Sequence, residues 1–141
     1  MEGTTAMSVS LNPYLNFRQG TREAMEFYAS VFGGDLTVST FAENGGMGMP
    51  DAEQDKVMHS QLVTGDGLTL MAADVPESME IGANGTVSLS GDDGAALRRY
   101  WDGLVDGGSV TVPLEKAPWG DSFGMCTDRF GVAWMVNIIG G

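Results

Sequence analysis

The sequence predicts an α+β protein in which two βαβββ modules form one cupped, half-barrel sheet. Two observations lead to this fold class: hydrophobic patterns that switch between strand and helix periods, and the recurrence of their order in the second half of the chain. FGGDLTV (32–38) corresponds to DGGSVTV (106–112) at an offset of 74 residues, and GLTLM (67–71) corresponds to GVAWM (131–135) at an offset of 64. The two offsets differ because of an insertion in the loop 43–56, where added residues cost little.

The first module is expected over about residues 10–74. Residues 11–17 alternate as a strand with one face on a core, and a helix follows from Thr21, its predicted N-cap, to the Gly33-Gly34 pair. Extended segments are predicted at 36–41, 57–64 and 68–73. The loop 43–56 has two open interpretations: it closes over a ligand or a second copy of the chain, or it is a disordered surface loop.

The second module is expected over about residues 85–138, after a linker at 75–84. Residues 86–90 alternate, and a helix that begins at Asp92 or Asp93 carries Leu97 and Trp101 on its apolar face before Gly107-Gly108 ends it. Extended segments follow at 110–114, 122–127 and 132–138. Residues 9–141 are therefore expected to form a single domain, preceded by a flexible tail over residues 1–8.

Charge and composition limit the possible partners. The chain has 19 acidic and 7 basic residues in 141, which argues against a nucleic-acid or membrane partner because phosphate groups attract clustered Lys and Arg. No apolar run approaches the length that crosses a bilayer, and the first residues do not have the pattern of a signal peptide. The single cysteine, Cys126, cannot form an internal disulfide, which fits a cytoplasmic protein.

The pleat of the predicted strands separates an apolar face from a mixed one. The helix-facing set is almost wholly apolar: Pro13, Leu15, Phe17, Leu68, Leu70, Val87, Leu89, Val132, Trp134 and Val136. The opposite, cavity-facing set mixes methionines and aromatic rings with amides and hydroxyls: Asn12, Tyr14, Asn16, His59, Gln61, Thr69, Met71, Thr86, Ser88, Phe123, Met125, Ala133, Met135 and Asn137. A mixed lining of this kind is typical of a pocket for a small organic molecule.

His59, the only histidine, is the candidate catalytic residue, because an imidazole serves as a general base near neutral pH. An alternative is a histidine that is hydrogen-bonded within the sheet or contacts a ligand without chemistry. The candidate ligand-binding residues are Asn12, Tyr14, Asn16, Gln61, Met71, Trp119, Phe123, Met125 and Met135, with Trp119 expected at the pocket mouth. Cys126 is interpreted as a buried small hydrophobe and the segment 128–131 as a structural hairpin turn.

Five segments resemble the vicinal oxygen chelate superfamily, and within it the PhnB-like branch: PYLNF (13–17), EAMEFYASVFGG (23–34), MHSQL (58–62), LMAAD (70–74) and APWGDSFGMCTDRFGVAWMVNI (117–138). That superfamily includes glyoxalase I, extradiol dioxygenases, fosfomycin-resistance enzymes and bleomycin-binding proteins. The resemblance implies paired βαβββ modules, a cupped cavity and a homodimer.

Metal-dependent members of that family hold the ion with four ligands, mostly His and Glu, on the first and last strands of the modules. The matching positions here are Asn12 or Pro13, Leu70 or Met71, Thr86, and Met135. None offers a carboxylate or an imidazole, the groups that divalent ions prefer, so neither a metal site nor another cofactor is predicted.

The favoured hypothesis is metal-independent binding or sequestration of a small organic ligand, with antibiotic resistance implied by the resemblance. One alternative is a lyase, isomerase or transferase that uses His59, with Tyr14, Asn16 and Gln61 holding the substrate. Another is a metal-dependent glyoxalase or dioxygenase type of enzyme with a non-standard site. A third is a structural or partner-binding module with an occluded cavity. Whether the protein is an enzyme stays open at this stage.

Overall fold

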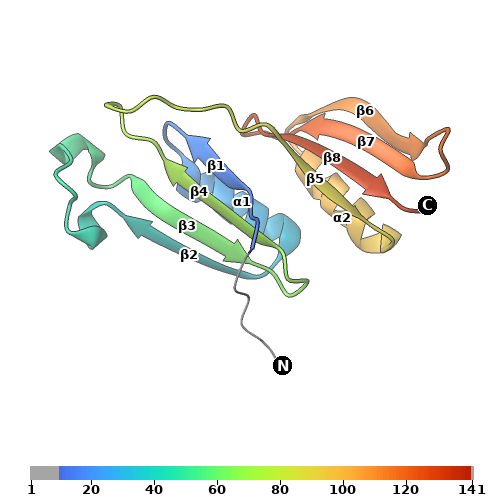
Figure 1. Ribbon diagram of the computed structural model, residues 1–141, viewed down its shortest axis with the longest axis horizontal. Helices are drawn as coiled ribbons and strands as arrows, with labels where there is room; N and C mark the ends of the chain where they lie inside the picture. The colour runs from blue at the N-terminus through green and yellow to red at the C-terminus, as the bar shows by residue number, and fades with distance from the viewer. Residues whose placement is uncertain (1–9, 141) are drawn as a thin grey trace.

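The computed structural model describes residues 10–140 and confirms the predicted fold class (Figure 1). Within those residues lie two α-helices and eight strands, the strands forming two four-stranded sheets that do not close into a barrel. None of the helices described between residues 10 and 140 is long and apolar enough to cross a membrane.

The two modules repeat one topology. The first has strand order β1-β4-β3-β2 and consists of β1 (Tyr14–Phe17), α1 (Thr21–Phe32), β2 (Asp35–Thr40), β3 (Val57–Val63) and β4 (Thr69–Asp74), with the 3₁₀ turns η1 (Ala42–Asn44) and η2 (Asp51–Glu53) before β3. The second has order β5-β8-β7-β6 and consists of β5 (Thr86–Gly91), α2 (Gly94–Val105), β6 (Ser109–Lys116), β7 (Ser122–Thr127) and β8 (Ala133–Ile138). In both modules the first strand is parallel to the last and the other pairs are antiparallel.

The beginning of α1 differs from the prediction. Thr21 is the first helical residue, and the N-cap is Gly20, which has a left-handed backbone conformation with φ of 85°. The backbone N–H and the hydroxyl of Thr21 donate to Asp74 Oδ1 at 3.1 and 2.7 Å, and Val57 N–H donates to Asp74 Oδ2 at 2.8 Å. A carboxylate from the last strand of the module therefore satisfies the helix start. The prediction for α2 is confirmed, because Asp93 is the N-cap and accepts from Ala96 N–H at 3.1 Å.

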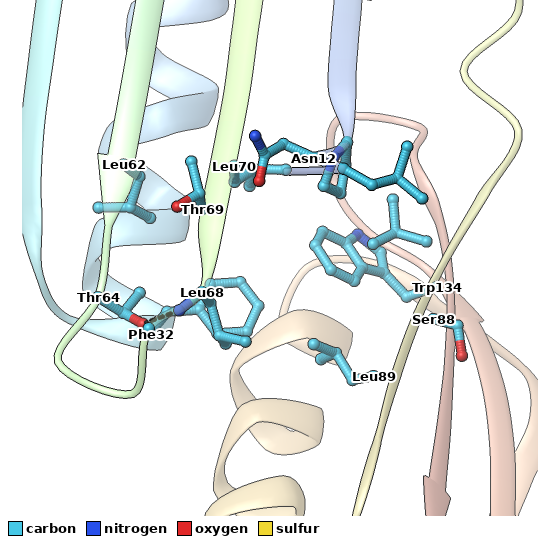
Figure 2. A pocket seen from close by; sticks show the side chains of 14 residues that line it. Asn12, Phe32, Leu62, Thr64, Leu68, Thr69, Leu70, Ser88, Leu89 and Trp134 are labelled. Atoms are coloured by element: carbon cyan, nitrogen blue, oxygen red, sulfur yellow. Dashed lines mark hydrogen bonds between the residues drawn. The ribbon is translucent and has the colours of Figure 1, made fainter. Parts of the chain in front are cut away.

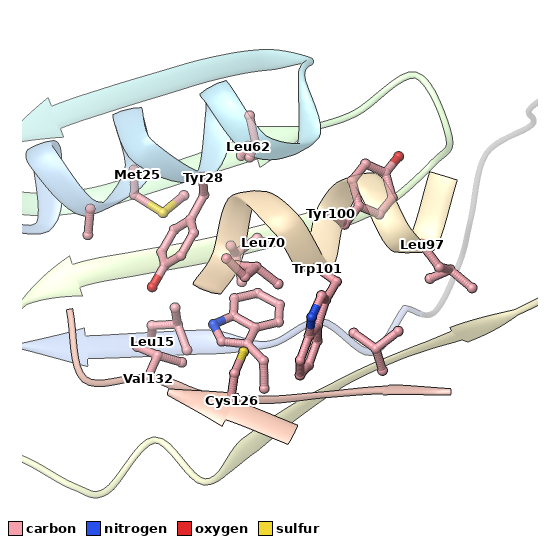
Figure 3. Packing of buried hydrophobic residues seen from close by; sticks show 14 of the residues in the cluster. Leu15, Met25, Tyr28, Leu62, Leu70, Leu97, Tyr100, Trp101, Cys126 and Val132 are labelled. Carbon is pink, nitrogen blue, oxygen red and sulfur yellow. The ribbon is translucent and has the colours of Figure 1, made fainter. Parts of the chain in front are cut away.

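The core is continuous between the modules because the helices pack against each other as well as against their own sheets. Both helices lie behind the sheets in Figure 1, so the opposite faces of both sheets are uncovered toward the viewer. Phe32 of α1 contacts Tyr100 and Trp134 of the second module at ring-centroid distances of 4.9 and 5.6 Å. Figure 3 shows Tyr28 and Trp101 within this single cluster, and Trp101 and Trp134 are buried as predicted.

The loop between β2 and β3 has hydrogen bonds of its own, in contrast to the disordered loop considered above. The Gln54 amide donates to the carbonyl oxygens of Gly46 and Met49 at 3.2 and 2.7 Å. Lys56 lies 2.8 Å from the Glu53 carboxylate, which also accepts from a backbone N–H of the linker. These contacts order the loop internally and join it to the linker. Its role toward a ligand or a second copy stays a prediction.

Candidate functional site

Burial alternates along the strands as the pleat predicts. On β8, Trp134 and Val136 are buried against the helices, whereas Met135 and Asn137 on the other side are half-exposed. Leu68 is a partial exception, because it was assigned to the helix-facing set but keeps 38% of its surface exposed. Each sheet therefore has one face on the core and one face without a covering layer.

The uncovered face of the first sheet, called the first face below, gathers five of the predicted site residues: Tyr14, Asn16, His59, Gln61 and Met71. Tyr14 lies opposite Met71, and Met71 lies opposite Gln61, so these three side chains form a row across β1, β4 and β3. The Tyr14 hydroxyl oxygen lies 3.1 Å from His59 Nδ1, and the two ring centroids are 5.8 Å apart. The sheet has thus brought together a phenol and an imidazole that are 45 residues apart in sequence.

Partial burial raises the pKa of the Tyr14 hydroxyl above its ordinary value. The phenol therefore stays protonated near neutral pH, and its hydroxyl donates to His59 Nδ1 in one imidazole tautomer and accepts from it in the other. Tyr14 is 44% exposed, so an incoming molecule can reach this pair. The arrangement can orient a ligand by hydrogen bonds and, with a suitable substrate, move a proton.

The uncovered face of the second sheet, called the second face below, contains Phe123, Met125, Met135 and the adjacent Trp119. Trp119 packs edge to face on Phe123 at 5.7 Å and is 62% exposed. The register of the two modules places Met125 where the first face has Gln61, because each lies opposite the methionine of its last strand. The first face is consequently rich in hydrogen-bonding groups, while the second is aromatic and thioether-rich.

The two asparagines predicted as site residues near β1, Asn16 and Asn12, have different surroundings. The Asn16 backbone N–H and carbonyl are bound by the Asn84 side chain of the linker, at 2.7 and 3.1 Å, which covers this edge of β1. Asn12 precedes β1 and lines a cleft between the modules, and its amide donates to the Ser10 hydroxyl at 3.1 Å. Asn12 and Tyr14 also line one hollow at the inner edge of β1, so Asn12 lies at the border of the first face.

The cleft between the modules is a feature that sequence reasoning missed. It has a volume of about 240 Å³ and is lined from both modules, as Figure 2 shows for Leu62, Leu70, Leu89 and Trp134. Alternation in the sequence assigns such residues to a filled core. It carries no signal for a space left where two modules meet.

The role of Asp128 is a second feature that sequence reasoning missed, because the sequence indicated only a hairpin turn at 128–131. Its carboxylate is 3% exposed and accepts from Tyr28 Oη at 2.6 Å and from Trp134 Nε1 at 2.8 Å. It also accepts from the backbone N–H groups of Phe130 and Val132 at 2.8 and 3.1 Å. Burial and the neighbouring carboxylate raise the pKa of the Tyr28 hydroxyl far above its ordinary value. This node joins the modules and lies on the core side, away from the two faces.

The positions at which metal-dependent relatives hold an ion do not fit one here. Leu70 is buried in the core, and Met71 and Met135 offer only thioethers, which hard and borderline divalent ions bind poorly. Among residues 10–140, no three or more His, Cys, Asp or Glu side chains are grouped so that they could hold a metal ion.

Two βαβββ modules of one topology, each with an uncovered sheet face, define the class of protein that the sequence resembled. The family model described as the Glyoxalase/Bleomycin resistance protein/Dioxygenase superfamily matches residues 10–136, and the chain belongs to that superfamily. The resemblance inferred from the sequence segments is confirmed.

Three proteins that are similar to this chain over most of its length are known from sequence or structure. Protein YjdN of Escherichia coli (strain K12) is 25% identical over 142 residues, which cover 92% of this chain and 95% of that protein. The crystal structure of protein PA1353 from Pseudomonas aeruginosa is 41% identical with a TM-score of 0.76, covering 93% of this chain and 98% of that one. The PhnB protein from Bacillus cereus is 22% identical with a TM-score of 0.68, covering 92% of this chain and 99% of that one, and shares the fold.

Proposed function

We propose that this protein binds a small organic molecule against the uncovered faces of its sheets and does so without a metal ion. The observation that carries the proposal is the pairing of two accessible faces with complementary chemistry: the Tyr14–His59 hydrogen bond on the first face, and the Trp119–Phe123 contact on the second. Such a combination suits a guest with an aromatic or aliphatic body and a few hydrogen-bonding groups.

The family name includes bleomycin resistance, which supports sequestration of an antibiotic-like guest in the cytoplasm as one form of this function. Mass spectrometry under native conditions, on protein purified from its own host, would detect a carried guest by its added mass. Calorimetric titration with bleomycin tests the antibiotic form directly. The control Thr111→Ala, on the exposed β6, should leave binding unchanged. Binding that also persists unchanged after both Gln61→Ala and Met135→Ala would contradict use of the two faces.

We also propose that the protein is a homodimer in which the second copy covers part of these faces. Large apolar side chains stand exposed on the second module, with Val110, Val112 and Trp119 exposed by 48%, 37% and 62%. Exposed apolar surface of this kind marks interaction sites. Light scattering after size exclusion should give twice the chain mass, and a monomer at all concentrations would refute the dimer.

Metal independence has its own test. Stoichiometric Zn²⁺, Ni²⁺, Mn²⁺ or Fe²⁺ should leave the melting temperature unchanged, because a ligand stabilises a protein only if it binds the folded state. A saturable rise with any one of these ions would overturn this part of the proposal.

A second candidate function is catalysis of a lyase, isomerase or transferase type with His59 as general base. The 3.1 Å contact between the Tyr14 hydroxyl and His59 Nδ1 supports it, because in the tautomer with the ring proton on Nδ1 the imidazole donates to the phenol oxygen and Nε2 keeps a free lone pair that can accept a proton. Once a guest is identified, His59→Gln separates the candidates: loss of turnover with unchanged affinity supports catalysis. Intact binding with no conversion by the wild-type protein supports sequestration.

A further inference from the structure

The cleft between the two modules has a physical origin in the sheet topology. β1 and β5 are the inner edge strands, and each pairs on one side only, with β4 and with β8. The modules contact each other through α1, α2 and their aromatic side chains, so the sheets stay separate above this contact. A second hollow, lined by residues 11–15 of the first module and 86–88 of the second, continues the cleft along the same two strands.

The lining of the cleft is neutral although the protein is strongly charged. Nineteen acidic and seven basic residues occur in the chain, yet none of the 14 residues that line the cleft, all of them described by the structure, is charged. The deep walls are Leu62, Leu70 and Trp134, which are 1%, 7% and 1% exposed. The Asn12 amide and the Thr69 hydroxyl, both only partly buried, contribute polar groups to the lining (Figure 2).

Size and chemistry together specify a class of ligand. An apolar cavity of roughly 150 Å³ can hold a benzene molecule, and this cleft measures about 240 Å³. A charged group would lose its hydration here without gaining a counter-charge, so the lining selects against ions of both signs. We infer that the cleft is a second binding site, distinct from the Tyr14–His59 and Trp119–Phe123 pairs on the two sheet faces, for a neutral and largely apolar molecule about as large as a bicyclic aromatic ring.

Indole is a suitable probe because it is neutral, bicyclic and carries one N–H donor for the polar rim. Titration of the full chain, followed by NMR of the Leu, Val and Met methyl groups, should give saturable shifts at Leu68, Leu70, Val87 and Leu89. Tryptamine and indole-3-acetate, which carry opposite charges on the same ring, should bind at least about tenfold more weakly, a difference of one decade in Kd.

Two variants fill the cleft from opposite sides. Leu68→Phe acts from the half-open mouth on the first module and Val87→Phe from β5, and each should weaken indole binding about tenfold or more. Circular dichroism verifies the fold, and Leu68 is exposed enough that a larger side chain leaves the core intact. Gln61→Ala and Met135→Ala, on the first and second faces, are the matched controls and should leave indole affinity unchanged.

The outcomes separate this site from the proposed function. Shifts that saturate at Met71 or Met135 instead of the cleft methyl groups would assign indole to the sheet faces and overturn the inference. Unchanged affinity in both filling variants, equal affinity for tryptamine, or the absence of saturable shifts up to the solubility of indole would overturn it as well. Shifts at Met71 or Met135 would agree with a guest held by the two faces, and the other results leave that proposed function untouched.

Discussion

Removal of one hydroxyl from the node at Asp128 should weaken the whole domain. Tyr28 Oη donates to Asp128 Oδ2 at 2.6 Å, and both side chains are buried, at 0% and 3% exposure. A hydrogen bond to a charged group contributes about 1.5–3 kcal/mol, because water cannot replace the lost donor at a buried site. Tyr28→Phe leaves the carboxylate with the donors from Trp134, Phe130 and Val132, so we expect a loss of about 2 kcal/mol in the free energy of unfolding.

Urea titration followed by circular dichroism measures this loss, and thermal unfolding should show a melting temperature lower by about 6 °C, from roughly 3 °C per kcal/mol at this chain length. Tyr100→Phe is the matched control, because the Tyr100 hydroxyl donates to the exposed carboxylate of Asp66 across the same module boundary. There water replaces the lost donor, and the expected loss is about 1 kcal/mol or less.

A loss below about 0.5 kcal/mol for Tyr28→Phe, or an equal loss in both variants, would refute the reasoning that burial of the Asp128 carboxylate decides the magnitude. Asp128→Asn extends the test. Four donors point at the Asp128 carboxylate, and the NH₂ group of asparagine would face some of them with a donor of its own. It should cost at least as much as Tyr28→Phe.

Three further predictions concern other parts of the chain. Gly34→Ala should cost about 2–3 kcal/mol of stability, because φ is +101° and a Cβ would lie 2.3 Å from a carbonyl oxygen of β3, whereas Gly33→Ala, with φ of +74° and open space, should cost about 1 kcal/mol. Burial, and to a lesser extent a nearby carboxylate, raises the pKa of the Cys126 thiol to about 11, so Ellman's reagent at about pH 8 should modify it only after unfolding in urea. The Lys56 ammonium holds the pKa of the Glu53 carboxyl below its usual range. The stabilisation of the folded protein by this ion pair is therefore present above the unfolded pKa near 4.5 and is lost as the pH falls through the folded pKa. Glu53→Gln should therefore reduce the stability difference between about pH 6 and about pH 3, and an unchanged difference would contradict this assignment.

Local patterns were sufficient to predict the fold class and the orientation of most side chains. Alternation in 122–127 and 132–138 placed Cys126, Trp134 and Val136 on the buried side, and the Gly33-Gly34 pair marked the end of α1. These features follow from the period of each element and from the backbone freedom of glycine, both of which depend only on neighbouring residues. The same reasoning gave one mixed cavity-facing set, and only the structure divided it into a polar first face and a second face rich in aromatic and thioether groups.

What the chain by itself determined was therefore the two modules, their pleat and the division of the strand residues into an apolar set and a mixed set. The tertiary structure alone decided three features: the contact between Tyr14 and His59, the capture of the α1 start by Asp74, and the Asp128 node. It also decided that the modules leave a neutral cleft between β1 and β5. Each of these depends on distances between segments that are far apart in sequence, and such distances are set by how the helices and sheets pack, which no local period encodes.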